Sequence, residues 1–175
     1  MTELGPLIDA CTMNDNAMNN IILTVGNSMM GDDGAGPLLA DLLSASPVPG
    51  WTVIDGGSAP ENVAHEVQAL APQRVLIVDA ADMGMTPGEM RLIDEASIAR
   101  MFIMTTHNLP LNFLMERLRE TVAEVLFLGI QPDIVVFGFP MTDRVRAAVE
   151  TLHARLLMGD DPVLFQQCGY EEEMT

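Results

Sequence analysis

The sequence contains no lysine, and all eight of its basic residues are arginines. Against 25 acidic residues, this leaves a formal net charge of −17. Such a surface repels nucleic acid and anionic membranes, because binding to phosphates requires clustered cations. We therefore expect no nucleic-acid partner and no membrane association.

Long apolar runs and a cysteine framework are missing as well. No stretch approaches the roughly 18 apolar residues that a bilayer-spanning helix needs. The first twenty residues have neither the basic n-region nor the apolar core of a secretory signal, so we expect a cytoplasmic protein. The only cysteines, Cys11 and Cys168, lie near opposite ends of the chain, which is typical of neither a disulfide framework nor a metal-ligand pair.

The length of 175 residues predicts a single domain. We expect a flexible N-terminal extension at residues 1–19, an α/β domain at residues 20–160 and an acidic C-terminal tail at residues 161–175. The tail begins where helical and strand periodicity stops.

Between the two ends, short apolar runs alternate with helical patterns. Buried strands are predicted at residues 21–25, 51–54, 75–78, 125–128 and 134–137, with an edge strand at 90–93. Helices are predicted at residues 37–43, 61–70, 111–122 and 145–156, with Thr142 as the cap of the last. This order predicts a three-layer α/β domain, with a twisted, mostly parallel sheet of about five strands and helices on both faces.

In such sheets, ligands bind beyond the carboxyl ends of the strands. The loop after the first predicted strand carries Asp32 and Asp33, Asp79 follows the third strand, and a later loop carries His107. A carboxylate that directly follows four apolar strand residues, as Asp79 does, is costly to bury unless it is paired or bound to a metal. One acid of the Asp32–Asp33 pair could serve a helix N-terminus, but a second adjacent acid is harder to assign to that role. Asp33, Asp79 and His107 are thus a candidate metal site, for which nickel, zinc, iron and manganese are all suitable.

Other features of these loops have simpler interpretations. The glycines after the first strand lack the G-x-G-x-x-G spacing of a dinucleotide loop, so we expect no nucleotide cofactor. The methionines near the loops fit apolar gap-filling better than binding of a soft metal. The H-E-x-x-H signature of helical zinc proteases is absent.

Taken together, the loop sequences resemble those of the [NiFe]-hydrogenase maturation endopeptidases. The matching segments are VGNSMMGDDG at residues 25–34, DGGSA at 55–59, LIVDA at 76–80, MTTHN at 104–108 and FLGIQP at 127–132. They occur in the family's order, and their amino-acid sequences are most similar to those of the hydrogenase 3 (formate hydrogenlyase) branch. The likeness covers roughly residues 21–157, and it leaves out the N-terminal extension and the tail.

The resemblance implies an aspartic-type peptide hydrolase that recognises nickel in the precursor of a hydrogenase large subunit and then removes a C-terminal peptide. It places the family's nickel-contacting positions on Asp33, Asp79 and His107, and its substrate-recognition segment on Gly56 and Gly57. Asp33 or Asp79 would activate water as a general base, with metal-bound water as the competing nucleophile. We expect a monomer whose partner, the large-subunit precursor, supplies the nickel.

Two other functions share part of this pattern. A non-catalytic nickel-binding maturation chaperone would use the same ligands without cleaving its client. A phosphoacceptor receiver domain also has an acidic pair after its first strand and an aspartate after its third. It requires a late lysine for the phosphoryl group, however, and an arginine does not readily replace that lysine. The absence of lysine argues against the receiver domain.

Overall fold

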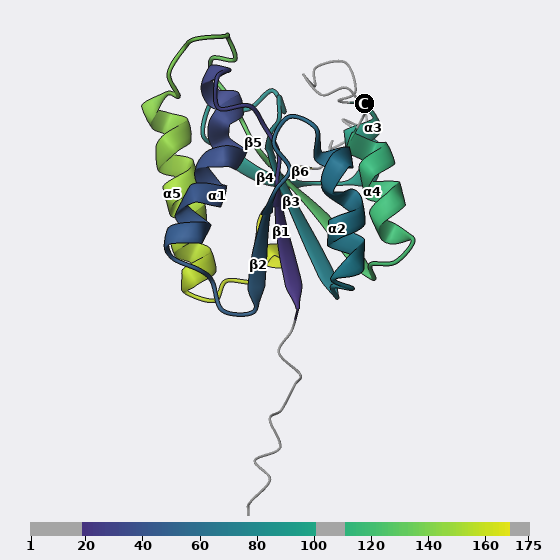
Figure 1. Cartoon of the computed structure of the whole chain (residues 1–175). Helices are drawn as coiled ribbons and strands as arrows, with labels where there is room; N and C mark the ends of the chain where they lie inside the picture. Colours follow the sequence, from purple (N-terminus) through teal and green to yellow (C-terminus); the bar gives the residue numbers. More distant parts are fainter. Residues whose placement is uncertain (1–18, 101–110, 169–175) are drawn as a thin grey trace, which may run out of the picture.

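Strands and helices alternate along most of the chain in the computed structural model, which describes residues 19–100 and 111–168 (Figure 1). The elements are, in order, β1 (Asn20–Thr24), η1 (Gly31–Gly34), α1 (Ala35–Ala45), β2 (Trp51–Asp55), η2 (Pro60–Val63), α2 (Ala64–Ala69), β3 (Arg74–Ala80), β4 (Met90–Ile93), α3 (Glu95–Arg100), α4 (Leu111–Arg119), β5 (Glu124–Ile130), α5 (Asp143–Leu157), η4 (Pro162–Leu164) and β6 (Gln167–Cys168). The four predicted helices are confirmed, whereas α3 was not predicted. None of the helices in the described part combines the length and the hydropathy needed to cross a membrane.

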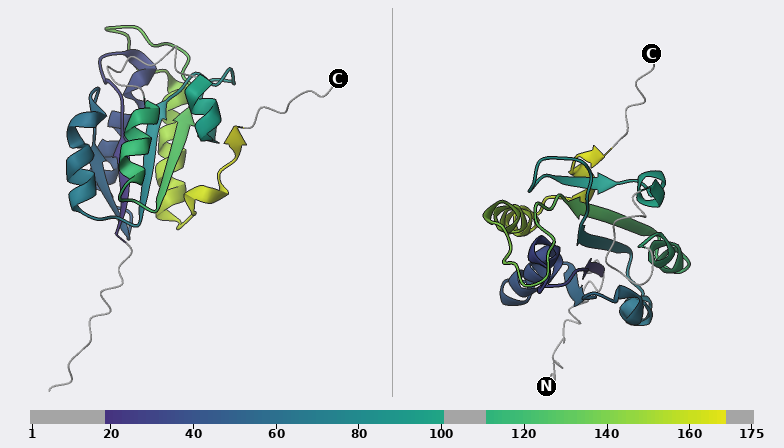
Figure 2. Two further views of the ribbon diagram at one scale, coloured as in Figure 1. Left: turned by 90° about the vertical axis from the view of Figure 1, so that its right-hand side faces the viewer. Right: turned by 90° about the horizontal axis from the view of Figure 1, so that it is seen from above.

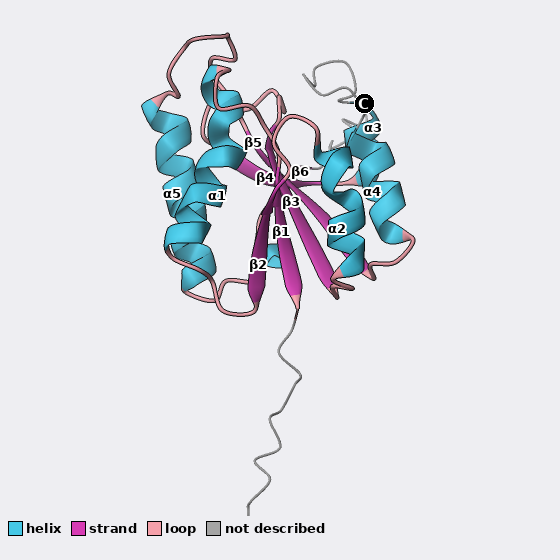
Figure 3. Cartoon of the chain, in the orientation of Figure 1, coloured by secondary structure: helices cyan, strands magenta, loops and turns pink. Residues whose placement is uncertain are grey.

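The strands form one sheet in the order β2-β1-β3-β5-β4-β6. β1 is parallel to β2 and β3, and β3 is parallel to β5, whereas β4 runs antiparallel to β5. Helices α1 and α5 cover one face of the sheet, and α2, α3 and α4 cover the other (Figures 1 and 3). The view from above shows the sheet between the two helical layers (Figure 2). The predicted three-layer α/β architecture with a mostly parallel sheet is confirmed.

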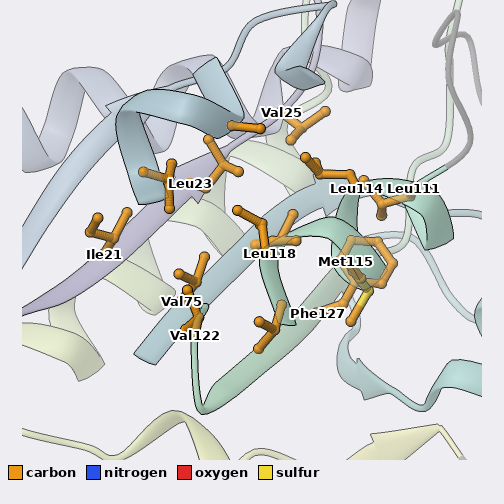
Figure 4. Close-up of a cluster of buried hydrophobic side chains, with 14 of the residues drawn as sticks. Ile21, Leu23, Val25, Val75, Leu111, Leu114, Met115, Leu118, Val122 and Phe127 are labelled. Carbon is orange, nitrogen blue, oxygen red and sulfur yellow. The ribbon is translucent and has the colours of Figure 1, made fainter. Parts of the chain in front are cut away.

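The central strands β1 and β3 are apolar on both faces, because helices pack against each side of them. Alternate residues of β1 enter different clusters: Ile21 and Leu23 face α2 and α4, while Ile22 faces α1 and α5. Figure 4 shows the first of these clusters, in which Leu118 of α4 also lies. Each fully buried side chain of this kind contributes roughly 1.5–3 kcal/mol. The carboxyl ends of β1 and β3 are therefore held firmly in place.

One predicted strand is wrong. Residues 134–137 belong to the loop between β5 and α5, although their β-branched and aromatic side chains are typical of a strand. The backbone of Ile134 pairs with Asp32 of η1: its carbonyl accepts from the Asp32 N–H at 2.8 Å, and its N–H donates to the Asp32 side chain at 3.0 Å. Because these partners lie in η1, the segment does not join the sheet.

The fold also continues past residue 160, where the sequence analysis placed the end of the domain. β6 pairs in parallel with β4, so β4 is not the edge strand that was predicted. Phe165 is buried, and the Arg155 guanidinium lies 3.9 Å from the centre of its ring. Arg74 forms an ion pair with Asp161 at 2.8 Å. Residues 161–168 are therefore part of the domain rather than of a tail.

Candidate functional site

Two of the three predicted metal ligands lie at the same edge of the sheet. Asp33 is in η1, which follows β1, and Asp79 is the penultimate residue of β3. β1 and β3 are neighbours, and the pairing extends beyond β1, since the Val25 N–H donates to the Val78 carbonyl at 2.9 Å. η1 also contacts β3 directly. Both carboxylates are buried, with 5% exposure for Asp33 and 1% for Asp79.

The third predicted ligand, His107, lies outside the described residues. Within the described ranges, no three side chains of the metal-binding types histidine, cysteine, aspartate and glutamate come together. The described part of the candidate site therefore consists of two buried carboxylates. Such a pair suits a divalent cation that takes further ligands from elsewhere, and either carboxylate can accept a proton from water.

The position of Asp33 depends on a close fold of the chain over the end of β1. Its Oδ2 accepts from the Asn27 N–H at 2.9 Å. Gly26 has a φ of 141°, and a Cβ at this position would lie 2.1 Å from the Asp33 carbonyl oxygen. A side chain at position 26 would therefore push η1 away from β1, and only glycine allows the observed approach.

The adjacent acid, Asp32, has a different role. Its side chain is fully buried, and its Oδ2 accepts from the N–H groups of Asp133 at 2.9 Å and Ile134 at 3.0 Å. Its Oδ1 accepts from the Thr142 N–H at 2.7 Å, and the Thr142 hydroxyl lies 3.0 Å from both carboxylate oxygens. Asp32 thus binds both ends of the loop that leads into α5. Its role is structural, whereas Asp33 belongs to the candidate site.

The prediction of Thr142 as the cap of α5 is right in position but wrong in side-chain role. Thr142 occupies the N-cap position with extended backbone angles, but its side chain makes no capping hydrogen bond. The hydroxyl donates to Asp32 instead. Sequence reasoning missed this role for Asp32, because its partners lie 101–110 residues further along the chain.

The predicted substrate-recognition loop is joined to the loop after β1. The Gly57 carbonyl accepts from the Gly26 N–H at 2.9 Å, and the Gly56 N–H donates to the Thr24 carbonyl at 2.7 Å. A Cβ on Gly56 would lie 2.9 Å from that Thr24 oxygen, whereas a Cβ on Gly57 would meet no atom within 4 Å. Gly56 therefore packs against β1, and Gly57 borders open space beside the candidate site.

Gln131 is a further residue that the sequence analysis did not single out. It follows β5, is buried, and accepts through Oε1 from the N–H groups of Met83 at 2.7 Å and Met85 at 3.2 Å. Its Nε2 donates to the Asp82 carboxylate at 3.2 Å. Gln131 therefore shapes the loop that follows Asp79. The sequence feature that could have pointed to Gln131 is its place in the segment FLGIQP, which resembles the family.

Two sequence comparisons relate the chain to known proteins. A family model described as hydrogenase maturation protease matches residues 37–158. The hydrogenase 3 maturation protease of Escherichia coli is 57% identical over 156 residues, which is 89% of this chain and 100% of that protein.

Solved structures show the same fold. The solution structure of the endopeptidase HycI from Escherichia coli matches with a TM-score of 0.83 and 57% identity, covering 89% of this chain and 100% of that one. The crystal structure of the [NiFe]-hydrogenase maturation protease HycI from Thermococcus kodakarensis matches with a TM-score of 0.69 and 26% identity, over 81% of this chain and 93% of that one. The family model, the curated relative and the fold agree, and the chain belongs to the hydrogenase maturation protease family.

Proposed function

We propose that this protein is an endopeptidase that removes a C-terminal peptide from the nickel-loaded precursor of a [NiFe]-hydrogenase large subunit of the hydrogenase 3 type. The observation that carries the proposal is the pair of buried carboxylates, Asp33 and Asp79, at one sheet edge of a chain in this family. The name of the 57% identical Escherichia coli relative, hydrogenase 3 maturation protease, supports the choice of substrate.

In this proposal the nickel belongs to the substrate. Asp33, Asp79 and His107 supply oxygen and nitrogen ligands, and the thiolates of the precursor supply the others, which suits a borderline divalent metal. The shared metal fixes the scissile peptide bond against the sheet edge, and such positioning lowers the barrier to hydrolysis. Gly57 borders open space beside this edge, so it is placed to let the substrate backbone approach closely.

Peptide hydrolysis then needs a base. The carboxylate of Asp33 or Asp79 takes a proton from the attacking water, whose oxygen bonds to the scissile carbonyl carbon. The carbon–nitrogen bond breaks, and the proton passes to the leaving amine. The Asn27 N–H holds the Asp33 carboxylate in a fixed orientation for this step. This assignment makes the enzyme aspartic in type.

Substitution of Asp79 by asparagine tests the assignment. We expect Asp79→Asn to slow cleavage of the nickel-loaded precursor by about 100-fold or more, the usual contribution of general acid–base catalysis. Asp41→Asn is the matched control, because Asp41 is an exposed acid on α1, and it should cleave at the wild-type rate. Normal processing by Asp79→Asn would remove that residue from the mechanism.

The cleavage assay and a phosphorylation assay together separate the two alternatives. A nickel-binding chaperone would bind nickel tightly and in stoichiometric amount but leave the precursor at full length. A receiver domain would form an acyl phosphate on Asp79 with acetyl phosphate and magnesium. The sheet argues against the receiver domain, because the order β2-β1-β3-β5-β4 with an antiparallel β4 departs from the all-parallel flavodoxin-like order 2-1-3-4-5.

A further inference from the structure

A patch of exposed apolar side chains lies at the same sheet edge as the candidate site. We define the apical loop as residues 133–142, which connect β5 to α5. Its Val136, Phe137 and Phe139 are 47%, 66% and 52% exposed, and Met29, from the loop after β1, is 57% exposed. These residues are four of the ten exposed large hydrophobic residues in the described part of the chain. Figure 1 shows the loop at the upper edge, above α1 and α5.

The backbone under this patch is held in place. Asp32 binds the loop near both of its ends, and the Gly138 N–H donates to the Met29 carbonyl at 2.8 Å. A Cβ on Gly31 would lie 2.4 Å from the Ile134 carbonyl oxygen, so the loop packs closely on η1. The exposed apolar side chains therefore extend from a backbone that hydrogen bonds and close packing hold in place.

The tip of the loop is a tight turn that presents an aromatic ring. The Phe139 N–H donates to the Val136 carbonyl at 3.2 Å, and Gly138 has a φ of 79°. This is the pattern of a type II turn, in which glycine takes the third position and the second residue stands at the tip. Phe137 is that second residue, and it is the most exposed phenylalanine in the described part of the chain.

The size of the patch favours a transient partner. From their exposed fractions, the four side chains offer roughly 400 Å² of accessible surface, given that a phenylalanine buries about 150–250 Å². A stable protein–protein interface needs about 800 Å² from each partner. The patch is therefore too small for a permanent second copy of this chain, but it suits a substrate that docks and leaves.

The charge of the chain and the position of the patch further limit the kind of partner that could bind there. Asp133 in the apical loop and Asp143 beside it are exposed, and so are Arg144 and Arg146 of α5, which balance them locally. The chain as a whole has a net charge of −17, so a strongly acidic segment would be repelled. Met29 lies four residues before Asp33, and η1 carries both Asp33 and the anchor Asp32. A protein bound at the carboxylates would extend over the patch.

We propose that the apical loop and Met29 form a docking surface for an apolar, non-acidic segment of the protein substrate. The proposal rests on the function proposed above, because that function makes the hydrogenase large-subunit precursor the substrate. The surface acts on the protein part of the precursor, while the carboxylates act on its metal. Its loss should therefore weaken substrate binding without slowing the chemical step.

The test is the double variant Phe137→Ser/Phe139→Ser with Phe113→Ser as control. Phe113 is 51% exposed on α4, in the other helical layer. We expect the double variant to raise KM for the nickel-loaded precursor about tenfold or more, as loss of aromatic anchors does. Its kcat should stay within twofold of wild type and its Tm unchanged, and the control should keep the wild-type KM. A KM within twofold of wild type in the double variant would overturn the proposal.

Further outcomes separate this proposal from the proposed function. If the wild type binds the precursor but does not cleave it, the proposed function fails. The docking surface then stands only if the double variant weakens binding about tenfold or more by calorimetry. If the wild type does not bind the precursor at all, both proposals fail. If sedimentation shows a dimer that the double variant abolishes, the patch is a contact between copies of this chain and the proposal is overturned.

Discussion

The adjacent acids Asp32 and Asp33 should respond differently to the same conservative substitution: stability should fall mainly at position 32 and activity at position 33. Asparagine has nearly the same shape as aspartate, but one of its two acceptor oxygens is replaced by a donor group. At position 32 both oxygens are in use, since they accept from two backbone N–H groups on one side and from Thr142 on the other. At position 33 the amide oxygen of asparagine can still accept from the Asn27 N–H.

The cost of Asp32→Asn follows from this geometry. The better orientation keeps the oxygen toward Asp133 and Ile134 and turns the amide nitrogen toward the Thr142 N–H. One buried N–H then has no acceptor, which costs about 1–3 kcal/mol, and the remaining bonds lose their charge assistance. We expect a total loss of roughly 2–4 kcal/mol in the free energy of unfolding. For a chain of this size, that lowers Tm by about 5–15 °C.

Urea denaturation followed by circular dichroism measures this difference. Asp32→Asn should shift the midpoint to lower urea, whereas Asp33→Asn should shift it less. In the cleavage assay, Asp33→Asn should lose about 100-fold in rate. Equal stability of Asp32→Asn and the wild type would show that the anchoring role of Asp32 is wrong.

Three further predictions concern residues around the site and at the opposite edge of the sheet. Gln131→Leu removes the acceptor of two backbone N–H groups and should cost about 2–4 kcal/mol by urea denaturation; a change below about 0.5 kcal/mol would refute its role in the loop after β3. Gly56→Ala should cost about 1–3 kcal/mol, since its Cβ would overlap the Thr24 carbonyl, whereas Gly57→Ala should cost about 1 kcal/mol of backbone strain and raise KM; equal stability losses would contradict the different packing of the two glycines. The hydrogen bond from Arg74 lowers the pKa of Asp161 below its ordinary 3.8, so its contribution is present above that value and is lost as pH falls through the lowered pKa. Because Asp161 is 45% exposed and solvent screens the pair, Asp161→Asn should cost about 1 kcal/mol or less at neutral pH, and the difference from wild type should vanish in strong acid; a difference that persists there would refute the ion-pair explanation.

Local patterns were sufficient to predict the elements that position the site. The apolar runs of β1 and β3 predicted buried central strands, and the rule that ligands bind beyond the carboxyl ends of parallel strands then led to Asp33 and Asp79. In the structure, both residues lie at the carboxyl ends of these strands. The roles of Asp33, Asp79 and His107 as nickel ligands stay predictions, and His107 lies outside the described residues.

Contacts between distant parts of the sequence account for what was missed. Residues 134–137 have strand-like side chains, but the backbone of Ile134 pairs with Asp32 in η1, 102 residues earlier. Residues 161–168 lack periodicity, and they are ordered by Arg74 and by pairing with β4. The anchoring role of Asp32 could not be predicted from the sequence, because only the folded chain shows which donors face its carboxylate.

Mass spectrometry of the large-subunit precursor after incubation with this protein tests the central claim most directly. The nickel-loaded precursor should lose a C-terminal peptide, and the same precursor without nickel should remain at full length. An unchanged mass for the nickel-loaded precursor, or equal cleavage with and without the metal, would contradict the proposed nickel-dependent endopeptidase.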